Sequence, residues 1–267
     1  MERVDPNAPS AVAFPTDAAI PNKRVEVNPL HLKPPCRMSA RAPVSAPPSS
    51  PVAPLAFPWL SIVLIAATLG VAAQPNLDVR LLFDRAAIAR GEFWRLWTGH
   101  FVHFGASHLT WNLAVFTLAA LWAERLRPFR TRVLLVLAPG GIGLALYGLE
   151  PALFTYGGLS GVAAALLAFL AFTQLARQPA AAPADSAGAA DAHAQSAARS
   201  DRWFWRAVLA LIVVKIGLEF AVNAPLFARF ASPGIRTVPL AHLVGVLAAT
   251  MVHRFSSFRP RLRVGSR

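Results

Sequence analysis

The sequence predicts an all-α, polytopic membrane protein, a bundle of six transmembrane helices with a disordered N-terminal extension. Of its 267 residues, 55% are hydrophobic and only 15% are charged, against roughly 25% charged in an ordinary soluble domain. The hydrophobic residues gather in blocks long enough to cross a hydrocarbon core of about 30 Å as helices. The arginines lie mostly between and beyond these blocks, so the net charge of +13 indicates membrane topology rather than a nucleic-acid partner.

The first segment, 1–54, is rich in Pro, Ala and Ser and has no lasting periodicity. Such a composition cannot bury enough apolar surface to fold, so we expect a disordered cytoplasmic extension. Either Met1 or Met38 is the true start. Cys36 is the single cysteine of the chain, which excludes an internal disulfide and a cysteine-based metal site.

A membrane domain at 55–255 follows, and the basic residues 256–267 form a cytoplasmic tail. Within the domain, the stretch 178–200 is Ala-rich and of low complexity, and we expect it to be a cytoplasmic loop. Each apolar block between polar stretches is interpreted as one span. The six predicted spans are 56–73, 107–123, 133–147, 158–176, 203–222 and 238–254.

The charges between the spans predict their orientation. The loop "ERLRPFRTR" after the second span carries four arginines and the tail "RFSSFRPRLRVGSR" carries five, whereas "GLEPALFTYGG" after the third span has no basic residue. Placing the Arg-rich segments in the cytoplasm puts both termini inside. The arginines of the loop after the first span weaken this pattern without reversing it.

Six polar or ionisable side chains lie inside the predicted spans, toward the outer side. Such residues are costly in lipid and usually face the interior of a bundle. Their similar depth predicts one shared site. They are His108, Asn112, Ser160, Lys215, Glu219 and His242.

Ser160 is the candidate nucleophile and His242 the candidate base. Small residues four apart beside each of them, Gly157 with Gly161 and Ala241 with Gly245, permit close helix packing, so the two side chains can meet. A histidine near its ordinary pKa of about 6.5 can take the proton of a serine hydroxyl at neutral pH. No carboxylate lies near His242 in the sequence, so a Ser–His dyad fits better than a triad. The alternative is a helix-packing serine and a histidine bonded to a backbone carbonyl.

His108 and Asn112 are four residues apart and share one helix face. Both side chains can donate hydrogen bonds, as an oxyanion hole requires. Alternatively, they join neighbouring helices by hydrogen bonds.

Together these motifs resemble the rhomboid family of intramembrane serine proteases. The matches occur in chain order across 57–254. They are "FWR" with Trp94 and Arg95, His108-x-x-x-Asn112, the GxSG motif Gly158-Leu159-Ser160-Gly161, and Ala241-His242-x-x-Gly245.

The resemblance implies a six-span rhomboid-like fold and a role for each matched residue. Ser160 would be the nucleophile and His242 the general base. Asn112, His108 and the Ser160 N–H would stabilise the oxyanion. Trp94 and Arg95 would anchor the outer loop at the lipid interface, where both residue types are favoured.

Lys215 and Glu219 depart from the general pattern of the family. Four residues apart on the fifth span, they can neutralise each other. They form either a structural ion pair or, through Glu219, a receptor for a substrate segment. This pair in a six-span core is similar to the rhombosortase branch, which implies cleavage near a C-terminal GlyGly-type sorting tail.

The sequence therefore predicts a serine endopeptidase of the bacterial inner membrane that acts on membrane-anchored proteins, with its site open to the periplasm. We expect no cofactor and no metal. HExxH is absent, which argues against a metalloprotease, and a metal at His100 and His103, three apart on the outer loop, is the weaker alternative. The alternatives are a silent rhomboid-like protein that binds transmembrane clients, and a small transporter, for which the required inverted repeat is absent.

Overall fold

The structure is a computed structural model of the chain, and it describes residues 56–74, 76–177, 189–222 and 237–255. All of them belong to one compact unit, Val52–Arg267. The expectations for the N-terminal extension with Cys36 and Met38, and for the basic tail, lie outside the described residues.

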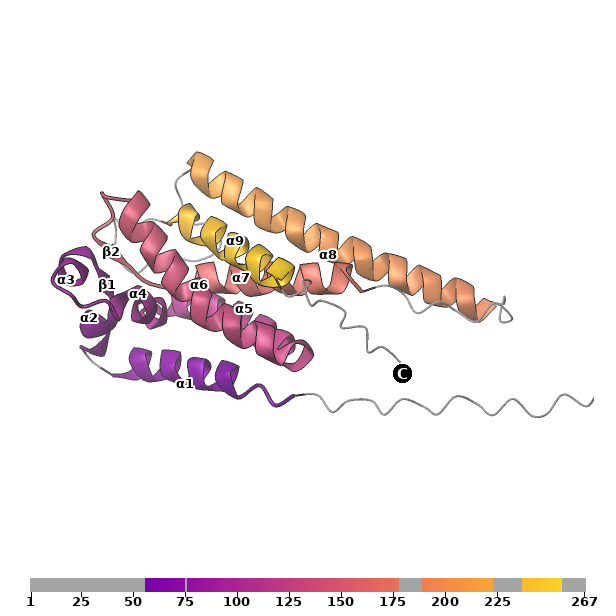
Figure 1. Cartoon of the computed structure of the whole chain (residues 1–267), viewed down its shortest axis with the longest axis horizontal. Coiled ribbons are helices and arrows are strands. Elements are labelled where there is room, and N and C mark those ends of the chain that lie inside the picture. Colours follow the sequence, from indigo (N-terminus) through magenta and orange to yellow (C-terminus); the bar gives the residue numbers. More distant parts are fainter. Residues whose placement is uncertain (1–55, 75, 178–188, 223–236, 256–267) are drawn as a thin grey trace, which may run out of the picture. The chain divides into compact units, whose positions relative to one another are not determined.

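The described part is mostly helical (Figure 1), as the sequence predicts. Two very short strands and one 3-10 helix complete it. In chain order the elements are α1 Trp59–Ala73, α2 Leu77–Leu81, β1 Phe83–Asp84, α3 Arg85–Ala89, α4 Arg95–Thr98, the 3-10 helix η1 Gly99–Phe101, α5 Ala106–Leu126, α6 Pro128–Leu149, β2 Thr155–Tyr156, α7 Ser160–Leu175, α8 Ala189–Val222 and α9 Pro239–Phe255.

Helices α1, α5, α6, α7, α8 and α9 lie at the six predicted apolar segments. The largest difference is at α8, which begins at Ala189, inside the stretch 178–200 that we expected to be a loop. Alanine has the highest intrinsic helix propensity. The Ala-rich residues 189–200 therefore extend the helix, and low complexity did not indicate a loop at these positions.

The prediction of six membrane spans stays a prediction. Among the described residues, α6 alone is both long and apolar enough to cross a membrane by itself. The segments Arg95–Phe101 and Ala106–Leu126 pass the same criterion together but are bent by 102°. Helices α1, α7 and α9 have 15, 16 and 17 residues. At 1.5 Å per residue they are about 23–26 Å long, a little short of a hydrocarbon core of about 30 Å.

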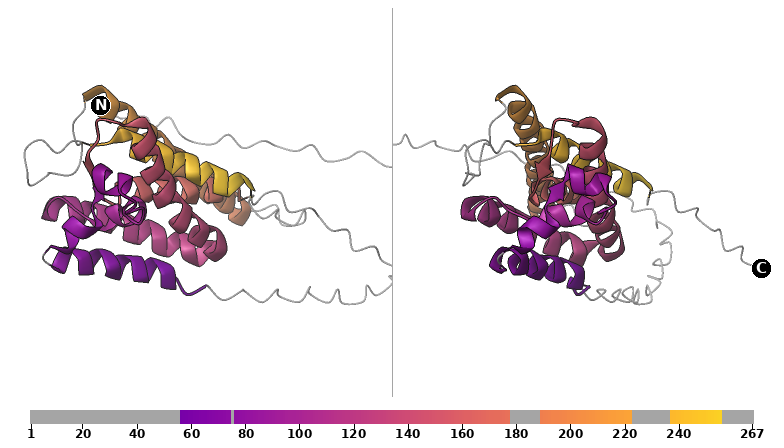
Figure 2. Two further views of the ribbon diagram at one scale, coloured as in Figure 1. Left: turned by 60° about the vertical axis from the view of Figure 1, so that its left-hand side comes forward. Right: turned by 90° about the vertical axis from the view of Figure 1, so that its left-hand side faces the viewer.

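Helix α7 lies at the centre of the bundle. It contacts α5, α6, α8 and α9 (Figures 1 and 2), and most of its side chains are buried. Helix α1 packs on α5, whereas α8 packs on α7 and α9, so α1 and α8 flank the bundle from different sides. The residues at the start of α7 are therefore held by several neighbours.

Helices α7 and α9 cross at glycines. A Cβ atom on Gly161 would lie 2.9 Å from the carbonyl oxygen of Ala241, and one on Gly245 would collide with the carbonyl oxygen of Gly161. Such close backbone approach is the property that small residues at four-residue spacing provide in membrane helices. Its glycines lie one residue from Ser160 and three residues from His242.

The segment between α1 and α5 forms a small folded unit rather than an open loop. Its strand β1 pairs with β2 in antiparallel register, Phe83 opposite Tyr156. Beside this pair, the guanidinium of Arg85 donates to four carbonyl oxygens at the end of α6 and just after it, at distances of 2.7 to 3.0 Å. A helix C-terminus leaves such carbonyls without partners, so Arg85 satisfies them and joins the outer segment to α6.

Glu124, near the C-terminal end of α5, makes a second junction between segments. Its carboxylate accepts hydrogen bonds from the N–H and Oγ of Ser61 at 2.8 and 2.6 Å, and it forms an ion pair with Arg132 at 2.7 Å. The Leu60 N–H contacts it at 3.4 Å. The carboxylate is fully buried and caps the free N–H groups at the start of α1. Three segments therefore meet at one negative charge.

We expect Glu124→Gln to lower the free energy of unfolding by about 3 kcal/mol, because it leaves the Arg132 guanidinium and the Ser61 donors with a neutral amide. Thermal unfolding in detergent measures the change. The adjacent Arg125, which is exposed, provides the control Arg125→Gln, expected to unfold like the wild type. Equal melting temperatures for Glu124→Gln and the wild type would contradict this role.

Candidate active site

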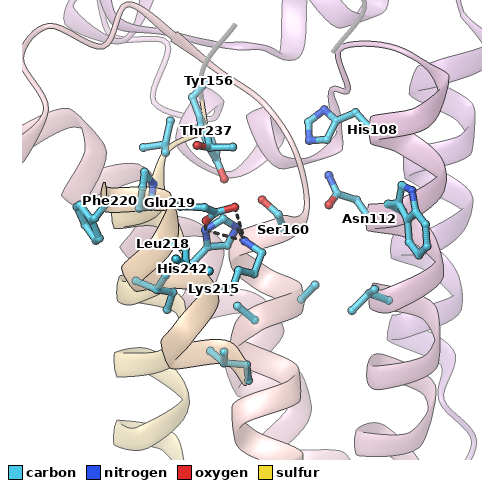
Figure 3. A pocket seen from close by; sticks show the side chains of 18 of the residues that line it. His108, Asn112, Tyr156, Ser160, Lys215, Leu218, Glu219, Phe220, Thr237 and His242 are labelled. Atoms are coloured by element: carbon cyan, nitrogen blue, oxygen red, sulfur yellow. Dashed lines mark hydrogen bonds and ion pairs between the residues drawn. The ribbon is translucent and has the colours of Figure 1, made fainter. Parts of the chain in front are cut away.

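One cavity of about 1110 Å³ lies where α5, β2, α7, α8 and α9 come together (Figure 3). The six polar residues that the sequence predicts to share a site all line it. They come from four helices: His108 and Asn112 from α5, Ser160 from α7, Lys215 and Glu219 from α8, and His242 from α9.

Ser160 is the first residue of α7. Its side chain points into the cavity, between the group formed by Lys215, Glu219 and His242 on one side and Asn112 on the other (Figure 3). The N-terminus of a helix presents unpaired N–H groups and a partial positive charge. An oxyanion that forms next to Ser160 is therefore favoured by the helix itself.

The α5 side of the cavity supplies hydrogen-bond donors. The Nδ2 of Asn112 is buried and has no hydrogen-bond partner among the described residues, which is costly unless a ligand or substrate fills the position. The Nδ1 of His108 accepts the N–H of Phe104 at 3.3 Å, so the neutral ring carries its proton on Nε2. Both donors lie beside Gly158, two residues before the candidate nucleophile.

On the α8 and α9 side of the cavity, a carboxylate and an ammonium group lie beside His242. Glu219 Oε2 lies 2.9 Å from His242 Nδ1, and Lys215 Nζ lies 2.7 Å from Glu219 Oε1. Lys215 Nζ also lies 3.2 and 3.4 Å from the two ring nitrogens of His242. No carboxylate is near His242 in the sequence, but the packing of α8 against α9 brings one to it.

The motif "FWR" is divided between the surface and the interior. Trp94 is exposed, as a side chain at a lipid interface must be. Arg95, which we expected to anchor the loop at that interface, is buried instead. Its Nε pairs with Glu92 Oε2 at 2.7 Å, and its Nη1 donates to the carbonyls of Val79 and Leu82. Five donors in a fixed planar group suit a turn with several free carbonyls.

Tyr156 and His103, which sequence reasoning missed, support the turn that carries Ser160. The Tyr156 hydroxyl donates to the Gly158 carbonyl at 3.3 Å and is hydrogen-bonded to Ser160. Burial raises the pKa of Tyr156 above its usual range, so the phenol stays protonated. His103 Nε2 is 3.5 Å from the Leu159 N–H, and burial lowers the pKa of His103 to about 4, which keeps its ring neutral. The sequence signal was the position of Tyr156 just before the glycines.

His100 also holds this turn. Its Nδ1 lies 3.2 Å from the Gly158 carbonyl and its Nε2 lies 3.1 Å from the Pro139 carbonyl. In the described part of the chain, no group of three or more His, Cys, Asp or Glu side chains has the geometry to hold a metal ion. His100 and His103 of the outer segment both contact backbone groups of this turn.

The arrangement supplies the parts that acyl transfer needs. A hydroxyl and an imidazole face one cavity, and donors on the far side can receive a developing negative charge. The model of the Rhomboid domain family matches residues 90–256, which is more than half of the chain and includes all six polar residues. A comparison with curated proteins found no match.

We expect Gly158→Ala to lower the rate of labelling by a fluorophosphonate probe about tenfold. Gly158 has φ +124°, a region in which alanine is strained, and its Cβ would lie 2.8 Å from His108 Cε1. The substitution therefore displaces a donor and the turn before Ser160. Labelling of purified protein in detergent measures the rate.

The matched control is Gly141→Ala on α6, where a Cβ meets no atom within 4 Å. It should label at the wild-type rate. If Gly158→Ala labels as fast as this control, the turn does not need glycine.

Proposed function

Because the chain belongs to the rhomboid family, whose members are integral membrane proteins and in general intramembrane serine proteases, we propose that it is an intramembrane serine endopeptidase. It cleaves membrane-anchored protein substrates. The observation that carries the proposal is the shared cavity. Ser160, His242 and Asn112 face the same space, and Asn112 Nδ2 has no partner among the described residues.

The reaction follows from these positions. His242 takes the proton of the Ser160 hydroxyl as the oxygen adds to the carbonyl carbon of the scissile peptide. The negative oxygen of the tetrahedral intermediate receives hydrogen bonds from Asn112 Nδ2, His108 Nε2 and the N-terminus of α7. His242 then gives its proton to the leaving amine. Water hydrolyses the acyl-enzyme by the same steps, with His242 again as the base.

The rim of the cavity favours an apolar substrate segment. Trp111 of α5 and Leu211, Val214 and Leu218 of α8 line the cavity and are exposed. Exposed apolar residues along two helices mark a surface that contacts lipid or another apolar segment. A transmembrane substrate therefore reaches Ser160 between α5 and α8.

The membrane orientation follows from the charges between the spans. Both termini lie in the cytoplasm of a bacterial cell, and the cavity opens toward the periplasmic side of the inner membrane. This orientation supplies water to a serine at the outer end of α7 while the apolar rim stays in lipid.

The substrate is a protein with a C-terminal GlyGly-type sorting tail, as in the rhombosortase branch. The Lys215–Glu219 pair supports this choice, because it is the feature by which the six-span core resembles that branch. A pair of glycines lets the substrate backbone approach closely.

We expect a fluorophosphonate probe to label the wild type in detergent and to fail on Ser160→Ala, which lacks the attacking oxygen. His242→Ala should label more slowly by a factor on the order of 10³ or more, because no base remains. Gel fluorescence of purified proteins measures both. Equal labelling of the wild type and Ser160→Ala would exclude the proposed serine protease activity and favour the alternative, a protein that binds transmembrane clients.

We expect a model substrate that ends in a GlyGly-type tail to be cleaved with a kcat/KM at least about tenfold above that of the same tail with GlyGly replaced by LeuLeu, a difference of about 1.4 kcal/mol. Cleavage in proteoliposomes measures the ratio. An unrelated transmembrane substrate serves as the control. Equal kcat/KM values for the two tails would exclude the proposed GlyGly specificity but would not contradict the proposed protease activity.

A further inference from the structure

We propose that Glu219 is a positioning carboxylate for His242, so that the site is a Ser160–His242–Glu219 triad in which Lys215 holds the carboxylate. The inference rests on the proposed function. It differs from a Ser–His dyad and from both sequence-based interpretations of the Lys215–Glu219 pair.

The two carboxylate oxygens of Glu219 have separate partners. Oε1 accepts from Lys215 Nζ at 2.7 Å, whereas Oε2 lies 2.9 Å from His242 Nδ1. No donor in the described part of the chain makes a well-aligned hydrogen bond to Oε2. The Oε2–Nδ1 contact is therefore close but oblique.

Burial makes this contact significant. Glu219 is 2% exposed and His242 is 4% exposed. An isolated charge at such a position in a membrane domain is very costly, but Lys215 neutralises the carboxylate at 2.7 Å. The pair therefore keeps an ionised acceptor next to the imidazole without a net buried charge.

Lys215 does not block the base. Its Nζ is nearly equidistant from the two ring nitrogens, at 3.2 and 3.4 Å. The lone pairs of the two nitrogens point in widely different directions, so an atom at nearly equal distances lies off the axis of both. For His242 to act as the base, Nε2 takes the proton of Ser160 and Nδ1–H is directed at Glu219.

The chemical role is that of the carboxylate in a hydrolytic triad. An acceptor at Nδ1 selects the tautomer in which Nε2 is free to act as the base. When His242 takes the proton of Ser160, the imidazolium is stabilised by Glu219 and no proton passes to the carboxylate. Lys215 has the opposite effect on the protonated ring of His242, because its positive charge destabilises the imidazolium.

Several titratable side chains line the cavity together with His242. They are Lys215 and Glu219 of α8, Tyr156 of β2, His108 of α5 and Glu150, which follows α6. Among these, Lys215 and Glu219 are the charged groups in contact with the imidazole. Substitutions of these two residues therefore change the electrostatics of the base in opposite senses.

The test compares Glu219→Gln, Glu219→Asp and Lys215→Met with the wild type in proteoliposomes. For Glu219→Gln we expect kcat to fall by about 10² to 10⁴-fold, as when a triad carboxylate becomes an amide, with KM nearly unchanged. Glu219→Asp should recover part of the loss. The acidic limb of the kcat/KM profile should move to lower pH in Glu219→Gln and to higher pH in Lys215→Met.

Two further measurements separate this role from its alternatives. A fluorophosphonate probe has no peptide segment, so its labelling rate falls with Glu219→Gln if the residue positions His242 and stays unchanged if it only receives substrate. The double variant Lys215→Met/Glu219→Gln removes both charges and leaves neither unpaired. We expect the double variant to react as slowly as Glu219→Gln. If the ion pair has only a structural role, the double variant should instead react at the wild-type rate.

Glu124→Gln is the matched control, because it also removes the charge of a buried carboxylate in an ion pair, at the other end of the bundle. Per folded molecule it should keep the wild-type pH profile. The triad is overturned if Glu219→Gln keeps the wild-type kcat and pH profile. The proposed function itself fails only if Ser160→Ala still cleaves, which is a different result.

Discussion

The close crossing of α7 and α9 is the constraint on which the rest of the site depends. Gly161 and Gly245 have no side chain, and added Cβ atoms would meet the backbone of the opposite helix. The crossing sets the separation of the two helices, and its glycines lie one residue from Ser160 and three residues from His242. Since α8 also packs on α7 and α9, the same crossing determines where Lys215 and Glu219 can reach.

Three charged side chains of this apolar domain, Arg85, Glu124 and Glu219, each have specific polar partners. Arg85 binds carbonyl oxygens at the end of α6, and Glu124 binds backbone N–H, hydroxyl and guanidinium groups. Glu219 lies between an ammonium and an imidazole. Each joins segments that are far apart in the sequence. Burial of a charge is therefore tolerated here where it fixes a junction between elements.

The sequence predicted the positions of the main helices and the six polar residues of the cavity. These features depend on local signals: apolar length, helical spacing and small residues four apart. It did not predict that Glu219 reaches His242, because that contact depends on the packing of α8 against α9. The inward orientation of Arg95 was missed for a similar reason, since its carbonyl partners lie in a turn without a sequence motif. The start of α8 at Ala189 was also missed, because the low complexity of 178–200 was interpreted as a loop.

The backbone hydrogen bonds of the turn before Ser160 go to the outer segment. Phe83 pairs with Tyr156, the Gly99 carbonyl accepts the Gly158 N–H at 3.4 Å, and His100 contacts the Gly158 carbonyl at 3.2 Å. None of these contacts comes from α5 or α8. The attacking oxygen is therefore positioned from the outer segment, whereas α5 and α8 supply the other polar groups of the cavity, so the chemistry depends on how these separately anchored parts of the chain are held together.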